Sequence, residues 1–186
     1  MKKVFSLIIL SLFTNLFSQT KITSASELSA WNSKKESNNE FKTNFNGEDY
    51  IDSVLILLNR YRIENGVEPL VLSNNLSKVA NLQSQYCADN LMVTHDQEDE
   101  NLRTPFDRGL KFNEGEVMGE IVSECSIGML TMKNTTIPSS PIQNFKKSKG
   151  HSNIMKDPEF VRCGISLVQS EKDKDRYYTV IVFSTN

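Results

Sequence analysis

Two histidines and one glutamate are the residues of this chain best suited to chemistry. His95 and His151 are the only histidines among 186 residues, and Glu120 lies between them in the stretch Met-Gly-Glu-Ile-Val-Ser. Imidazole and carboxylate are the usual ligands of zinc-like ions, and three such ligands leave one position open for water. The three residues come from separate segments, so only folding can join them. From spacing alone, two surface histidines and an ordinary glutamate are the simpler interpretation.

Other combinations of reactive residues are weaker. Alternating glutamates near Glu120 could act as an acid and base pair on a sugar, but solvated charge at a strand edge explains them more simply. Ser148 lies three residues before His151, without an acidic orienting residue or a nucleophile elbow. A pair of Cys125 and His151 would resemble that of a cysteine protease, but Cys125 falls in an apolar strand without an activating setting. The sequence also contains no HExxH, P-loop or GxGxxG motif.

Several predicted elements must position these residues. Helical spacing of apolar residues predicts helices over residues 49–64 and 74–90. A hydroxyl cap followed by proline predicts shorter helices at 105–109 and 141–147, and His151 begins a further helical turn. Residues 69–72 are predicted to form an extended link. Strands are predicted at 117–125, 161–167 and 177–183, the last two as an antiparallel hairpin, with 161–167 buried on one face only. Helices followed by antiparallel strands predict an α+β layered domain.

The N-terminus has the layout of a secretory signal peptide over residues 1–18. Lys2 and Lys3 precede a short apolar run, which is followed by small or polar residues. An uncleaved membrane anchor is the alternative, although the run is short for a span. Residues 19–46 are polar and predict a linker or extension, which leaves 47–186 as the folded domain. We therefore expect a secreted, periplasmic or cell-envelope protein that is not transmembrane once the signal is removed.

Composition limits the partners. The chain holds 21 Lys and Arg against 23 Asp and Glu, so it lacks the basic footprint of a nucleic-acid-binding domain. Its three cysteines, Cys87, Cys125 and Cys163, permit at most one internal disulfide. A buried free thiol is expected for Cys87. A bond between Cys125 and Cys163 is a hypothesis that requires their strands to be neighbours.

The order of several short motifs resembles the CAP superfamily, also called SCP or cysteine-rich secretory, antigen 5 and pathogenesis-related-1 domains, in its bacterial secreted branch. The resemblance covers residue 48 to the end, and no single motif carries it. Its elements are Leu58-Asn59-Arg60-Tyr61-Arg62, Asn65-Gly66, Pro69-Leu70, Thr94-His95, Thr104-Pro105-Phe106-Asp107-Arg108, Gly119-Glu120, Ser148-Lys149-Gly150-His151 and Cys163-Gly164-Ile165. The resemblance reverses the simpler interpretation of the two histidines.

The resemblance implies a three-layer α-β-α sandwich with a central antiparallel sheet. It also implies a cleft in which His95 matches the first family histidine, Glu120 the glutamate of a Gly-Glu-Asn motif, and His151 the second histidine. Related clefts can bind a divalent metal such as Zn²⁺, and other relatives bind lipids or act on partner proteins. Three positions depart from the family. Ile121 replaces the asparagine, Phe145 stands where tryptophan is usual, and Ser148 replaces a second glutamate.

These residues support two hypotheses from different classes. The first is a non-enzymatic binding module whose cleft, at His95, Glu120, His151 and Ser148, takes a lipid or similar small ligand, and a metal held by His95, His151 and Glu120. Its partner would be that ligand or an extracellular protein. The second is a metal-dependent peptide or ester hydrolase with Glu120 as base. A structural or adhesive domain with a relict cleft is a third interpretation, which Ile121 slightly favours.

Overall fold

The structure is a computed structural model that describes residues 47–115, 117–128 and 139–185. The expected signal peptide, at residues 1–18, and the linker, at 19–46, lie outside the described residues. The predicted domain boundaries therefore stay predictions. Within the described ranges, no helix is both long and apolar enough to span a bilayer.

The helices and strands follow the order expected from the sequence. They are α2 (Gly47–Glu64), β1 (Val71–Leu72), α3 (Asn74–Asn90), α4 (Pro105–Leu110), β2 (Val117–Ser126), α6 (Ser139–Lys147), α7 (Lys149–Met155), β3 (Arg162–Gln169) and β4 (Arg176–Ser184). Local chemistry explains the boundaries. Gly66 follows α2 with a φ of 74°, a left-handed conformation that ends helices easily. The Ser73 side chain accepts a hydrogen bond from the Leu76 amide and caps α3.

The strands form one sheet in the order β1-β3-β4-β2. The predicted β3–β4 hairpin is confirmed as antiparallel, and β2 pairs antiparallel with the other side of β4. The link at 69–72 differs from the prediction because two of its residues join β3 as a parallel strand. The Val71 amide donates to the Val161 carbonyl at 3.0 Å, and the Ser73 amide donates to the Cys163 carbonyl at 2.8 Å.

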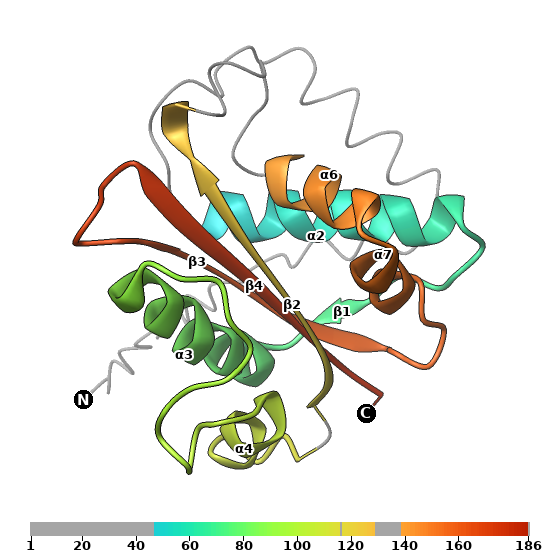
Figure 1. Cartoon of the computed structure of the whole chain (residues 1–186). Coiled ribbons are helices and arrows are strands. Elements are labelled where there is room, and N and C mark those ends of the chain that lie inside the picture. The colour runs from blue at the N-terminus through green and yellow to red at the C-terminus, as the bar shows by residue number, and fades with distance from the viewer. Residues whose placement is uncertain (1–46, 116, 129–138, 186) are drawn as a thin grey trace, which may run out of the picture.

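Helices cover both faces of the sheet, which confirms the three-layer α-β-α sandwich. Figure 1 shows α2, α6 and α7 on one face and α3 on the other, with α4 beside α3. Each interface has its own apolar core. The first core includes Tyr50, Val54, Leu58, Ile121, Phe145, Ile165, Ile181 and Phe183. The second includes Leu76, Val79, Ala80, Val122, Tyr178, Val180 and Val182. Strand β4 supplies both cores, as expected of a central strand.

Strand β3 is buried on both faces, and the prediction that one face would be solvated is wrong. Gly164 and Ser166 are buried beneath α3. A Cβ at Gly164 would lie 2.0 Å from the Leu76 carbonyl carbon, so the close approach of α3 requires glycine there. The Ser166 and Ser84 hydroxyls form a hydrogen bond at 2.8 Å. Small residues, rather than solvent exposure, explain the alternating pattern.

Arg62 fastens the end of α2 to the segment that carries His151. Its side chain is fully buried and donates to backbone carbonyls at 2.7–2.9 Å. The acceptors are Glu68, Met155, Asp157 and Phe160. Because two of these carbonyls lie at and just beyond the end of α7, the contact fixes this helix against α2.

The hypothesis of a bond between Cys125 and Cys163 is wrong. Cys125 lies on β2 and pairs with Tyr177, whereas Cys163 lies on β3 and pairs with Phe183. Strand β4 separates the two strands, and the registers differ by six residues along β4. All three thiols are free and buried, which confirms the expectation for Cys87.

Candidate functional site

A buried carboxylate joins a histidine to an arginine. The Nδ1 atom of His95 lies 2.9 Å from Oε1 of Glu120, and a terminal nitrogen of Arg108 donates to Oε2 at 2.6 Å. The side chains of Glu120 and Arg108 are 1% and 0% exposed, whereas that of His95 is 51% exposed. The carboxylate therefore holds the His95 ring from inside and leaves its other edge toward solvent.

Strand alternation explains why Glu120 faces this way. Side chains two residues apart lie on the same face of a sheet. Glu120 therefore shares a face with Val122, which packs in the α3 core, while Ile121 is fully buried in the opposite core. The resemblance implies an asparagine at the position of Ile121, where this chain has an apolar core contact instead.

Backbone contacts from two sides fix His95. The Gln83 side chain on α3 donates to the Thr94 carbonyl at 2.6 Å, and it accepts from the Gln97 side chain at 3.0 Å. Arg108 also donates to the His95 carbonyl at 3.2 Å. The loop is therefore tied to α3 and α4 on both sides of the histidine.

A capping box places Arg108. The Thr104 hydroxyl accepts from the Asp107 amide, and the Asp107 carboxylate accepts from the Thr104 amide at 2.9 Å. Pro105 follows in the first helical position, where its fixed φ favours the helix. Arg108 then points inward and donates to the carbonyls of two preceding loop residues at 2.9 and 3.0 Å.

His151 approaches from the other layer of the sandwich. It is the third residue of α7, and its ring meets the Phe145 ring edge-on at 5.1 Å between centroids. Among the described residues, no hydrogen bond joins His151 to His95 or Glu120. The two histidines are nevertheless close enough for the charge on His95 to lower the pKa of His151. Because β2 lies at the edge of the sheet that the described residues form, the two histidines flank that edge from opposite layers.

Ser148 immediately precedes α7 and is half-buried. Its side chain makes no capping hydrogen bond, although its carbonyl accepts the Ser152 amide at 2.8 Å. It lies about one helical turn before His151, at the position where the resemblance implies a second glutamate.

Local surroundings move the pKa values of the two histidines apart. The hydrogen bond to Glu120 raises the pKa of His95 above its ordinary value, and this outweighs the opposing effect of partial burial. Burial lowers the pKa of His151, with a smaller effect from His95. Between these two values His95 carries a proton while His151 is neutral.

The thiols near the site are not suited to act as nucleophiles. Cys87 is buried, and burial raises the pKa of its thiol. Cys125 is also buried, and burial raises the pKa of its thiol to about 12. A thiol protonated at neutral pH is a poor nucleophile. A cysteine and histidine pair therefore has no support in the geometry.

The described residues do not fit the expected three-ligand metal centre. Both oxygens of Glu120 already accept hydrogen bonds, one of them from a buried guanidinium. Within the described ranges, no three His, Cys, Asp or Glu side chains are grouped closely enough to hold a metal. A metal held by His95, His151 and Glu120 stays a prediction that requires Glu120 to exchange a partner.

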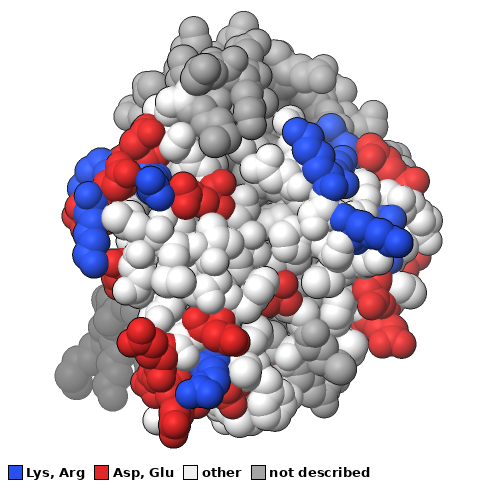
Figure 2. Space-filling model, in the orientation of Figure 1, with Lys and Arg blue, Asp and Glu red and all other residues white. Residues whose placement is uncertain are grey.

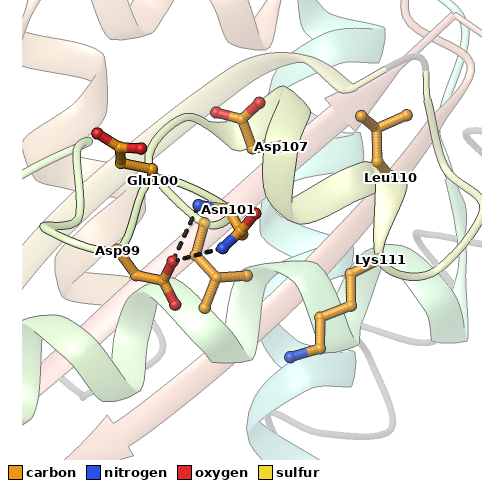
Figure 3. A pocket seen from close by; sticks show the side chains of 7 residues that line it. Asp99, Glu100, Asn101, Asp107, Leu110 and Lys111 are labelled. Atoms are coloured by element: carbon orange, nitrogen blue, oxygen red, sulfur yellow. Dashed lines mark hydrogen bonds between the residues drawn. The ribbon is translucent and has the colours of Figure 1, made fainter.

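A separate hollow lies beside α4. It measures about 650 Å³ and is lined by Asp99, Glu100, Asn101, Leu102, Asp107, Leu110 and Lys111. Figure 3 shows Asp99 bonded to Asn101, with Glu100 and Asp107 on the same side of the hollow. The Asp107 carboxylate is engaged by the Thr104 cap. None of the predicted site residues lines this hollow.

Arg108 is the site residue that the sequence did not assign. It belongs to the motif at residues 104–108, to which the sequence analysis assigned no functional residue. The glycine that follows Arg108 is a local signal that this helix packs closely against its neighbours. A side chain at Gly109 would clash with the Glu114 backbone and Val117. The pairing with Glu120 could not be predicted, since it depends on the strand facing α4.

Comparisons with known proteins agree with this fold. The family model for CAP, the cysteine-rich secretory protein family, matches residues 55–183. No curated protein sequence matches the chain. Among solved structures, an outer surface protein from Borrelia burgdorferi is similar at a TM-score of 0.60 and 14% identity, covering 75% of this chain and 95% of that one.

Two further solved structures share the fold. An extracellular protein containing an SCP domain from Bacillus anthracis has a TM-score of 0.57 at 18% identity, covering 74% of this chain and 41% of that one. A cysteine-rich secretory protein from Staphylococcus aureus has a TM-score of 0.52 at 15% identity, covering 74% and 39%. This chain thus spans about two fifths of those two proteins. At such identities the likeness concerns the fold alone, whereas the family model covers most of the chain. The chain belongs to the CAP (cysteine-rich secretory protein) family.

Proposed function

We propose that this CAP domain is a binding module whose histidine site, formed by His95, Glu120 and His151 with Ser148 nearby, takes a small ligand such as a lipid. One observation carries the proposal. The carboxylate is used internally to orient and charge His95, and no activated nucleophile accompanies it among the described residues. A half-exposed, oriented imidazole is suited to hold the polar end of a ligand through a charge-assisted hydrogen bond.

We also propose that the chain is exported. The layout of residues 1–18 supports this. The similar proteins from Borrelia burgdorferi and Bacillus anthracis are described as an outer surface protein and an extracellular protein.

A fluorescent long-chain fatty acid is a direct probe of the ligand site. We expect saturable binding to the native chain, and a loss of roughly tenfold in affinity for His95→Ala and for His151→Ala, since hydrogen bonds to charged groups contribute about 1.5–3 kcal/mol. Lys172→Ala, at an exposed position on the β3–β4 turn, is the matched control and should bind as the native chain does. Equal binding by the native chain and the double histidine variant would overturn the proposal.

Zinc is tested separately by calorimetry. Two histidines without a third ligand should give weak binding of Zn²⁺ that His95→Ala or His151→Ala abolishes. Equal heats for the native chain and the double histidine variant would show that these residues hold no metal.

Hydrolysis is the second candidate, and the divergent histidine pKa values favour it. A neutral His151 could accept a proton while a charged His95 donates one, which is how acid and base roles are divided in many enzymes. Glu120 is not placed to act as base, because both of its oxygens are engaged. Cleavage of an ester or casein substrate should fall at least about 100-fold in His151→Gln. Activity that survives both His151→Gln and Glu120→Gln unchanged would exclude this candidate.

A further inference from the structure

Three exposed lysines gather where α6 meets α7. Lys146 and Lys147 end α6, and Lys149 begins α7 after a single intervening serine. A fourth, Lys156, follows at the far end of α7. From residue 127 to residue 156 the sequence contains five lysines and no aspartate or glutamate, although the whole chain carries a formal charge of −2. This segment therefore carries a net positive charge within a chain that is acidic overall.

No carboxylate among the described residues neutralises these lysines. Within the described ranges, the ion pairs involve lysine only at Lys174, on the β3–β4 turn. The nearest acidic residues in the sequence are Asp157 and Glu159, beyond the end of α7. The Asp157 carboxylate accepts the Glu159 amide at 2.9 Å rather than a lysine. The charge at the α6–α7 junction is thus available to a partner.

One lysine is held in place without losing its charge. The Nζ atom of Lys146 lies 4.5 Å from the centre of the Tyr61 ring on α2. The Tyr61 hydroxyl in turn bonds the Ser152 hydroxyl of α7 at 2.9 Å. A cation over an aromatic face is attracted to it but remains charged. The junction therefore presents its positive charge on a fixed framework of three helices.

The shape of this surface suits an extended partner. Figure 2 shows basic side chains over α6 and α7 on the outer surface, beside a broad uncharged area. Lys146, Lys147 and Lys149 are all exposed, whereas sites for compact anions are concave and bury much of the ligand. The anionic headgroups of a lipid membrane can instead attract several exposed lysines at once.

We propose that the α6–α7 junction, with Lys146, Lys147 and Lys149, docks the domain on an anionic lipid surface. Phospholipid phosphates are the complementary charge, and an exported chain meets such a surface at the cell envelope. Docking by this junction places α7, and hence His151, near the headgroups. The interaction is electrostatic, so added salt weakens it.

Vesicle co-sedimentation tests this proposal. The protein is used as it is recovered from cells, with the same N-terminus in every variant, so residues 1–46 contribute equally throughout. We expect binding to phosphatidylcholine vesicles containing phosphatidylglycerol and much weaker binding to phosphatidylcholine alone. At about 1 kcal/mol for each lysine lost, and with two repelling carboxylates added, Lys147→Glu with Lys149→Glu should lower affinity by at least about 30-fold.

Lys172→Glu with Lys174→Glu is the matched control. It makes the same change in net charge at exposed positions on the β3–β4 turn, and its affinity should stay within about threefold of native. An equal loss in both double variants would show a general effect of charge and overturn the proposal. Retention on immobilised heparin that depends on Lys147 and Lys149, without vesicle binding, would identify a soluble polyanion instead and also overturn it.

Discussion

Glu120 organises the site at the scale of single residues. Its two oxygens connect a half-exposed imidazole to a buried guanidinium, and this arrangement sets the charge and orientation of His95. A carboxylate on one ring nitrogen fixes which nitrogen faces outward. In the proposed ligand site, Glu120 therefore acts through His95 as a positioning residue.

The two histidine pKa values provide the first prediction. Titration by NMR should show the pKa of His95 above 6.5 and that of His151 below it. The two rings are the only histidine signals in the chain, and single His→Gln variants assign them. Because His95 contributes to the lowered pKa of His151, His95→Gln should raise the pKa of His151. Two values that coincide near 6.5 would contradict the site geometry.

The raised pKa of His95 also gives stability a defined pH dependence. The folded state holds this proton more tightly than the unfolded state, so the contribution is complete below the unfolded value of about 6.5. It is lost as pH rises through the folded-state pKa. Urea unfolding across this range should show a loss of stability in the native chain that is smaller in His95→Gln. An identical pH dependence in both would refute the assignment.

Removing Arg108 should be costly. Arg108→Ala leaves the buried Glu120 carboxylate without its guanidinium, which typically costs about 3–5 kcal/mol of unfolding free energy. It should also raise the pKa of His95 further, since the charge of Arg108 opposes the protonation of that ring. The control is Arg103→Ala, an exposed arginine five residues earlier, which should change stability by less than about 0.5 kcal/mol. Similar effects of both substitutions would show that the pairing contributes little.

At the scale of elements, close packing of α3 on the sheet places the first histidine. Gln83 on α3 ties the loop that carries His95, and α3 approaches β3 at Gly164. The position of the His95 loop therefore depends on α3, which can approach β3 this closely only because Gly164 has no side chain.

Gly164→Ala tests this dependence. The new methyl group would meet the Leu76 backbone at 2.0 Å, so α3 must move, and we expect a loss of at least about 3 kcal/mol in unfolding free energy. Gly150→Ala, in α7, has nothing within 4 Å of its added methyl and should be neutral or stabilising by about 0.5 kcal/mol. Equal, small effects in urea unfolding would show that the contact at Gly164 is relaxed.

The sequence predicted the elements well and their faces less well. Helix spacing, the Ser73 cap and the cap with Pro105 located α2, α3 and α4 because these signals are local. The faces of β3 were mispredicted because Gly164 and Ser166 resemble solvated positions, yet they allow a helix to approach closely. The role of Arg108 and the separation of Cys125 from Cys163 depend on strand order, which spacing does not encode.

At the scale of the whole molecule, the sandwich brings two histidines from opposite layers to one edge of the sheet. His95 comes from the loop that follows α3, and His151 comes from α7 beyond α6. Strand β2, with no neighbour beyond it in the described sheet, lets both layers reach the same place. Positive charge at the α6–α7 junction lies on the His151 side only. The surroundings of the two histidines therefore differ, because exposed lysines lie close to His151 in the sequence.

The most direct test of this account follows both histidine rings while a ligand binds. Labelled protein is titrated with dodecanoate, and the imidazole signals of His95 and His151 are recorded by NMR. If both histidines line one site, both sets of signals should shift with the same dissociation constant. Glu120→Gln should lower the affinity for dodecanoate, because it removes the carboxylate that holds His95. Dodecanoate that binds while neither ring responds, or while only one does, would contradict the account.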